Sequence, residues 1–139
     1  MKNVLLIDDD LNHLAVLAVA LVESGYWVIP KMDAESVTAI VRENVRIDLI
    51  ILDYDMPGLD VPSFMSMLGV STPNVPVIVF TGCGNLDTYL KVMSLGAFEY
   101  MNEPIIAEEL KRVVDTALRN RAAETAEDIL ALRSGIGKR

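Results

Sequence analysis

The sequence predicts an α/β domain in which helices cover both faces of a parallel sheet. Apolar runs of about four to six residues, bounded by Gly, Pro, Asn or Asp, alternate repeatedly with longer segments of helical spacing. Runs that are apolar throughout are typical of strands buried on both faces, because a half-exposed strand would alternate polar and apolar residues. Repeated β-α alternation implies right-handed crossovers and a parallel sheet. A chain of 139 residues is long enough to form one such domain with a sizeable core.

Five apolar runs predict the strands, and turn-forming residues border each of them. In chain order the predicted strands span 3–7, 27–30, 49–52, 75–80 and 99–101. Oxygen-bearing side chains follow four of these runs: Asp8 and Asp9, Asp53, Thr81 and Glu103. In open sheets of this kind, ligands sit beyond the carboxyl ends of the strands, where the strand order reverses. We therefore expect these five residues to converge in space.

The segments between the strands predict the helices. In chain order the predicted helices span 11–23, 34–44, 62–68, 86–95 and 105–132. Asp10 or Asn12 can cap the first helix, and Gly25 follows its end. Asp33 can cap the second, and Gly96 stops the fourth.

Composition narrows the function classes. The chain has 12 basic and 20 acidic residues, a net charge of −8, which repels phosphate backbones and argues against direct binding of nucleic acid. A single cysteine excludes an internal disulfide and suits a reducing compartment. Neither a leader nor an apolar stretch of about 20 residues is present in the sequence, so we expect no membrane span and a cytoplasmic location.

The clustered carboxylates predict a metal site. Several carboxylates held together are unfavourable unless a cation neutralises them, and hard oxygen ligands suit Mg²⁺ or Mn²⁺. A carboxylate beside such an ion can act as a nucleophile toward a phosphoryl group. Thr81 is placed to hydrogen-bond the phosphoryl oxygens.

The motifs that carry this chemistry resemble the receiver domain of bacterial two-component response regulators. They are Asp8-Asp9, Asp53-Tyr54-Asp55-Met56-Pro57-Gly58, Thr81-Gly82, Gly96-Ala97-Phe98-Glu99-Tyr100 and Pro104. The resemblance covers roughly residues 2–120. It implies a flavodoxin-like (βα)5 fold with strand order 2-1-3-4-5, and a signalling domain rather than an enzyme.

The resemblance also implies a role for each matching residue. Asp53 matches the aspartate that accepts phosphate from a histidine kinase or phosphotransfer protein. Asp8, Asp9 and Asp53 match the carboxylates at the Mg²⁺ site, where Asp55 offers its backbone carbonyl. Thr81 matches the switch hydroxyl, and Tyr100 matches the aromatic residue that turns inward when the hydroxyl moves. Asp55 and Cys83 occupy the positions that tune dephosphorylation in the family.

Glu103 departs from the family pattern, which has a lysine before this proline. A lysine stabilises the added phosphoryl charge, whereas a glutamate at ~4 Å repels it by about 4 kcal/mol per pair of unit charges at an effective dielectric near 20. Lys31, after the second strand, has two interpretations. It either supplies the positive charge that the missing lysine would provide, or it is an ordinary solvated lysine in a loop. His13 is interpreted as a polar residue of the first helical turn with no partner for a relay or a metal site.

Two segments predict protein contacts. Residues 14–22 are apolar around the whole helix, which predicts a second protein or a second copy against the outer face. The stripe of Leu118, Ala122, Ala126, Ile129 and Leu132 continues past the length that the domain needs. It predicts pairing with another copy or a connection to an output domain. We therefore divide the chain into a receiver domain, 1–120, and a helical extension with a flexible tail, 121–139.

Three functions remain open from the sequence. The first is a receiver phosphorylated on Asp53 with altered chemistry. The second is a pseudo-receiver that binds or dimerises without phosphorylation. The third is a phosphohydrolase, because Asp53-Tyr54-Asp55 also resembles the Asp-x-Asp motif of that class. The missing cap insertion and lysine weaken the third.

Overall fold

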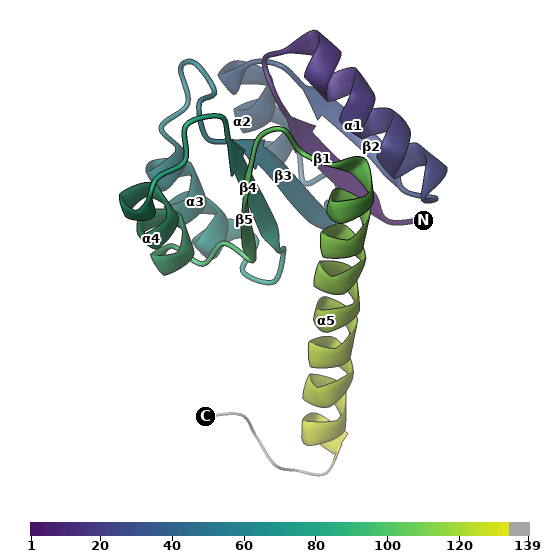
Figure 1. The fold of residues 1–139 in the computed structure, drawn as a ribbon. Coiled ribbons are helices and arrows are strands. Elements are labelled where there is room, and N and C mark those ends of the chain that lie inside the picture. Colours follow the sequence, from purple (N-terminus) through teal and green to yellow (C-terminus); the bar gives the residue numbers. More distant parts are fainter. Residues whose placement is uncertain (134–139) are drawn as a thin grey trace.

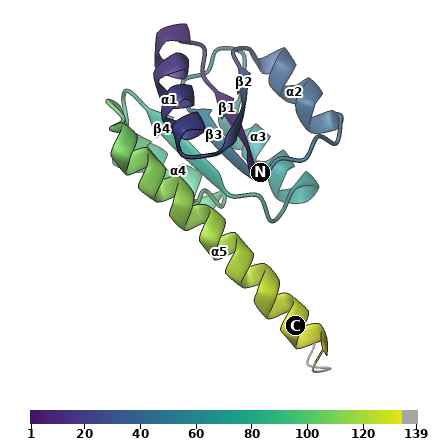
Figure 2. The same cartoon turned by 90° about the vertical axis from the view of Figure 1, so that its right-hand side faces the viewer.

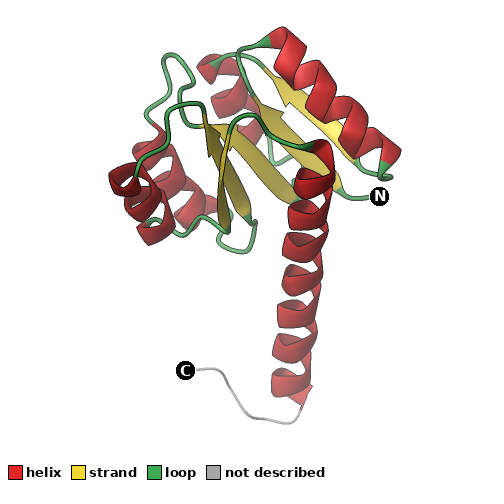
Figure 3. Ribbon diagram, viewed as in Figure 1, coloured by secondary structure: helices red, strands yellow, loops and turns green. Residues whose placement is uncertain are grey.

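The computed structural model describes residues 1–133, apart from the side chains of 122–129 and 131–133. Five parallel strands form one sheet in the order β2-β1-β3-β4-β5, and helices cover both faces (Figures 1 and 3). The strands are β1 (Asn3–Ile7), β2 (Trp27–Lys31), β3 (Leu49–Asp53), β4 (Val77–Thr81) and β5 (Glu99–Asn102). The helices are α1 (Leu11–Glu23), α2 (Ala34–Arg42), α3 (Val61–Ser71), α4 (Leu86–Ser94) and α5 (Ala107–Arg133). The predicted fold class and strand order are confirmed.

Some element bounds differ from the prediction for local reasons. The fourth strand starts at Val77 rather than Val75, because the N–H of Val75 donates to Thr72 in a turn and Pro76 has no N–H for the ladder. The second helix ends at Arg42, shortly before Asn44, whose φ is +56°. The third helix begins one residue earlier than predicted and continues through Gly69 to Ser71.

The sheet separates two apolar clusters. Side chains of α2, α3 and α4 pack on one face, and those of α1 and α5 pack on the other. All five residues of β3 and of β4 are buried, as expected for central strands covered on both faces. This packing fixes the carboxyl ends of β1, β3 and β4 beside one another, because β3 pairs with both neighbours.

The longest helix, α5, extends past the sheet. Arg121 ties it to the amino end of β3, where its Nη1 donates to the carbonyl of Asp48 at 2.8 Å and contacts Asp48 Oδ1 at 3.2 Å. The turns beyond Arg121 project away from the rest of the domain (Figures 1 and 2). The predicted stripe beyond Leu118 lies outside the described side chains, and the predicted flexible end, 135–139, lies outside the described residues.

The outer face of α1 is apolar. Leu14, Leu17 and Leu21 are buried against the sheet, whereas Val16 and Val19 are 62% and 58% exposed. The helix therefore has apolar side chains on both sides, as the sequence predicts. Among the described residues, no helix is long and apolar enough to cross a membrane.

Candidate functional site

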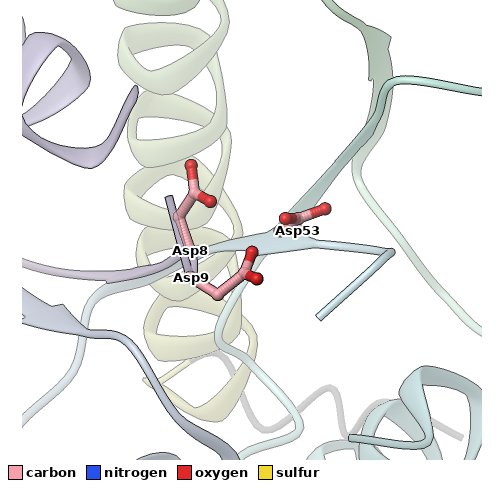
Figure 4. Close-up of side chains that lie close together, drawn as sticks. All are labelled: Asp8, Asp9 and Asp53. Atoms are coloured by element: carbon pink, nitrogen blue, oxygen red, sulfur yellow. The ribbon is translucent and has the colours of Figure 1, made fainter. Parts of the chain in front are cut away.

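Three carboxylates gather at the carboxyl ends of β1 and β3. Asp8 and Asp9 follow β1, and Asp53 is the last residue of β3 (Figure 4). One carboxylate oxygen of each lies within 4.8 Å of the others. Asp8 and Asp53 are buried, whereas Asp9 is exposed. The parallel pairing of β1 with β3 thus brings together residues that are 45 positions apart.

Local hydrogen bonds fix the direction of the two buried carboxylates. Asp8 Oδ1 accepts the N–H of Asp10 at 3.0 Å, and Asp10 in turn caps α1. Asp53 Oδ1 accepts the N–H of Asp55 at 2.9 Å. Each carboxylate therefore keeps its second oxygen for other partners, and the turns after both strands are held against them.

Burial makes Asp53 costly to ionise. Burial is the largest cause of the raised pKa of Asp53, whereas the hydrogen bond from the N–H of Asp55 lowers this pKa. The negative charges of Asp8, Asp55 and Glu103 raise the pKa further. The resulting pKa of Asp53 is about 7, compared with an ordinary value of 3.8. A bound cation would offset this cost.

The donor set fits a hard divalent cation. Three carboxylates with oxygens this close, two of them buried, match the oxygen ligands that Mg²⁺ and Mn²⁺ take in proteins. The exposed position of Asp9 leaves the cluster open on one side, as a site that also receives a substrate requires.

Thr81 ends β4 next to this cluster. Its hydroxyl donates to Asp55 Oδ2 at 2.8 Å and accepts the N–H of Cys83 at 3.3 Å. Thr81 is 1% exposed, whereas Cys83 is an exposed free thiol. The hydroxyl is therefore already engaged by a carboxylate two residues beyond Asp53.

Tyr100 lies behind Thr81 on the neighbouring strand. Its ring packs edge-on against Tyr89 of α4, with centroids 5.8 Å apart. Its hydroxyl is buried. Burial is the main cause that raises its pKa, followed by the charge of Asp55. A Cβ at Gly84 would clash with Asn102 Oδ1 and lie 2.6 Å from this hydroxyl, so the glycine leaves room for both side chains.

Glu103 and His13 line the same pocket, next to the carboxylate cluster. His13 Nδ1 is 2.5 Å from Asp8 Oδ2 and 3.6 Å from Glu103 Oε1. His13 lies on the first turn of α1 as predicted, but its contacts with Asp8 and Glu103 were not predicted from the sequence. A side chain on the first turn of a helix that follows Asp8 lies at the same sheet edge as Asp8, and this position was the signal to use. Lys31 exerts its charge on Asp33, and it is not among the charges that shift the pKa of Asp53.

Comparison with known proteins identifies the family. Residues 4–115 match the model of the response regulator receiver domain. The chain belongs to this family. The receiver has the sheet order, the helices and the acidic strand ends that the resemblance implied, and receivers are signalling domains that work with histidine kinases or phosphotransfer proteins.

Several relatives and solved structures are similar to this receiver. It is 33% identical to the two-component response regulator ORR21 of Oryza sativa subsp. indica over 89% of this chain and 18% of the rice protein. It is 34% identical to the transcriptional regulatory protein PrrA of Mycobacterium bovis over 86% of this chain and 51% of PrrA. The chain thus spans about a fifth to a half of these relatives.

Two solved receiver structures have nearly the same backbone. A receiver domain protein from Clostridium thermocellum has a TM-score of 0.82 at 30% identity, covering 88% of this chain and 98% of that one. The beryllofluoride-activated NtrC4 receiver domain dimer also has a TM-score of 0.82, at 29% identity, covering 87% and 99%.

Proposed function

We propose that this receiver accepts a phosphoryl group on Asp53, with Mg²⁺ or Mn²⁺ bound, and passes the signal on through protein contacts. The donor is a histidine kinase or a phosphotransfer protein in the cytoplasm. The observation that carries the proposal is the buried Asp53 carboxylate, with an oxygen within 4.8 Å of oxygens of Asp8 and Asp9. This arrangement suits both a divalent ion and a nucleophile beside it.

The reaction is an in-line displacement at phosphorus. A free oxygen of Asp53 forms the new O–P bond while the P–N bond of a phosphohistidine breaks, and the electron pair leaves with the imidazole. Asp8, Asp9 and Asp53, with the backbone carbonyl of Asp55, would hold the cation. When bound, the cation screens the negative charge of the incoming phosphoryl group. The hydrogen bond from the Asp55 N–H holds the other oxygen of Asp53 in place during attack.

The response runs through Thr81 and Tyr100. The Thr81 hydroxyl now donates to Asp55, so a phosphoryl group on Asp53 has to compete with that carboxylate for it. The Tyr100 hydroxyl and the Thr81 methyl group both border Gly84, and the Tyr100 ring packs against Tyr89 of α4. A change at Thr81 therefore reaches the surface formed by α4 and β5. Asp55 and Cys83 tune how long the phosphorylated state lasts.

Glu103 supports a second candidate, a pseudo-receiver that binds partners without phosphorylation. Its charge contributes to the raised pKa of Asp53, and a phosphoryl group would add further negative charge to the same pocket. In this version the bond between Thr81 and Asp55 holds one fixed state.

Two surfaces support contacts with a partner or with a second copy. One is the outer face of α1, where Val16, Val19 and Val22 are all more than half exposed. The other is the part of α5 that projects beyond Arg121 (Figure 2). Either surface can serve a homodimer, and the 121–139 segment can also connect to an output domain.

Reaction with a small phosphodonor separates the two candidates. The protein is incubated with phosphoramidate and Mg²⁺, and its intact mass is measured against a metal-free sample and the Asp53→Asn variant. The phosphorylation proposal expects one added phosphoryl group that requires both Mg²⁺ and Asp53. No adduct after long exposure, in protein that stays folded, would favour the pseudo-receiver.

A further inference from the structure

His13 lies beside the cluster of Asp8, Asp9 and Asp53, although it has no role in the proposed phosphoryl transfer. Its Nδ1 is 2.5 Å from Asp8 Oδ2 and 3.6 Å from Glu103 Oε1. Only 22% of the side chain is exposed. A single nitrogen thus faces both a proposed metal ligand and the residue that departs from the family pattern.

The imidazole ring is held in place from two directions. The backbone N–H of His13 donates to Asp10 Oδ1 at 3.2 Å as part of the cap of α1. The ring packs edge-on against Phe80 of β4, with centroids 5.2 Å apart and planes at 70°. These contacts aim Nδ1 at Asp8, and an N–H there is available in the neutral ring as well as in the charged one.

On the side away from His13, the Glu103 carboxylate lies against the backbone of Gly82. A Cβ at Gly82 would lie 2.8 Å from Glu103 Oε2, so the carboxylate rests close against this glycine. The backbone N–H of Glu103 donates to the carbonyl of Thr81 at 2.9 Å. Glu103 therefore sits between Gly82 and His13, close enough to Asp53 for its charge to be felt there.

We propose that His13 is a positioning residue that orients Asp8 toward the cation and retains Glu103 beside α1. In this way the site can bind Mg²⁺ and accept a phosphoryl group without the lysine that the family pattern has. The inference rests on the proposed function. Residues that hydrogen-bond a metal ligand typically change metal affinity by about 10-fold to 100-fold when they are removed. The Nδ1–H of His13 has this relation to Asp8, and the same nitrogen lies 3.6 Å from Glu103 Oε1, at the range of an ion pair rather than a hydrogen bond.

Metal affinity tests the first half of the inference. Mg²⁺ is titrated by calorimetry into the wild type and into His13→Ala, His13→Asn and the matched control Asn12→Ala. Asn12 is on the same helical turn, but its side chain is exposed. We expect His13→Ala to weaken Mg²⁺ binding by about 10-fold or more. His13→Asn should keep most of the affinity because its amide N–H occupies the place of Nδ1, and Asn12→Ala should bind as the wild type does.

Coupling to Glu103 tests the second half. The rate of adduct formation from phosphoramidate is measured for His13→Ala in the wild-type background and in Glu103→Gln. We expect a loss of about 10-fold or more in the first background and a clearly smaller loss in the second, because the neutral amide no longer repels the phosphoryl group. Metal-free unfolding curves of the same variants exclude a general loss of folding.

The outcomes separate this inference from the proposed function. Wild-type protein that binds no Mg²⁺ would overturn both. If the wild type binds Mg²⁺ and forms the adduct but His13→Ala does so equally well, only the role of His13 is overturned. If His13→Ala slows adduct formation equally in the wild-type and Glu103→Gln backgrounds, the proposed effect of His13 on Glu103 is overturned.

Discussion

Asp53→Asn should stabilise the metal-free protein at about pH 8, because the native fold holds Asp53 where its charge is unfavourable. Folding raises the pKa of Asp53 from 3.8 to about 7. Between these two values the folded state keeps a proton that the unfolded state has lost, so stability falls as the pH rises. The full loss above pH 7 amounts to about 4 kcal/mol, since a tenfold change in proton affinity corresponds to about 1.4 kcal/mol. The asparagine carries no charge and avoids this loss.

Urea unfolding followed by circular dichroism measures the effect. The wild type and Asp53→Asn are compared in EDTA at several values between about pH 4 and pH 8. The variant should gain up to about 4 kcal/mol at the upper end and almost nothing at the lower end. The control Asp9→Asn removes the same charge from an exposed position and should gain much less. Saturating Mg²⁺ should shrink the gain of Asp53→Asn, because the ion neutralises the wild-type cluster.

A difference between the wild type and Asp53→Asn that does not change with pH would refute this reasoning. It would mean that Asp53 ionises in the fold as easily as in water. If the stability gain of Asp53→Asn is the same in saturating Mg²⁺ as in EDTA, Asp53 is not part of the metal site.

Three further variants test other parts of the structure. Glu103→Lys should increase the yield of the phosphoryl adduct, by up to about a hundredfold for a charge change of two at close range, as intact mass would show; an unchanged yield would contradict the role given to Glu103. Asp48→Ala should destabilise the fold by about 3 kcal/mol in urea unfolding near neutral pH, because it removes the buried carboxylate that accepts the backbone N–H of Asn3 at 2.8 Å and pairs with Arg121 at 3.2 Å. The pKa of Asp48 is lowered, since hydrogen bonding and basic neighbours outweigh its burial. The ionised Asp48 carboxylate therefore stabilises the fold above pH 3.8, and this stabilisation is lost as the pH falls through the lower native pKa. A destabilisation by Asp48→Ala that persists in strong acid would contradict this prediction. Gly84→Ala should cost about 1–3 kcal/mol and displace Asn102 and Tyr100, because the new Cβ would clash with Asn102 Oδ1 and lie 2.6 Å from the tyrosine hydroxyl. Its control Gly69→Ala, within α3 with nothing near the added Cβ, should gain up to about 1 kcal/mol.

Burial patterns made the sheet predictable from the sequence. Strands such as β3 and β4 are covered on both faces, so their residues are apolar throughout, and the carboxylate or hydroxyl at the end of each stands out. The parallel arrangement then brings Asp8, Asp9 and Asp53 to one edge without further information.

The contacts of individual side chains were less predictable. The contacts of His13 with Asp8 and Glu103 were not predicted, because sequence spacing does not show that the start of α1 and the β5-α5 connection meet at the sheet edge. The bond between Thr81 and Asp55 likewise depends on how two adjacent strand ends face each other. Helix ends such as that of α2 were set by backbone conformations that only the fold reveals.

Chemical trapping of the modified residue tests the central claim most directly. The protein is treated with phosphoramidate and Mg²⁺, then reduced with borohydride, which converts an aspartyl phosphate to homoserine, and its peptides are sequenced by mass spectrometry. We expect homoserine at position 53 alone, and none when the metal is omitted. Homoserine at another aspartate, or unmodified Asp53 in protein that binds Mg²⁺, would contradict the assignment of Asp53 as the phosphoryl acceptor.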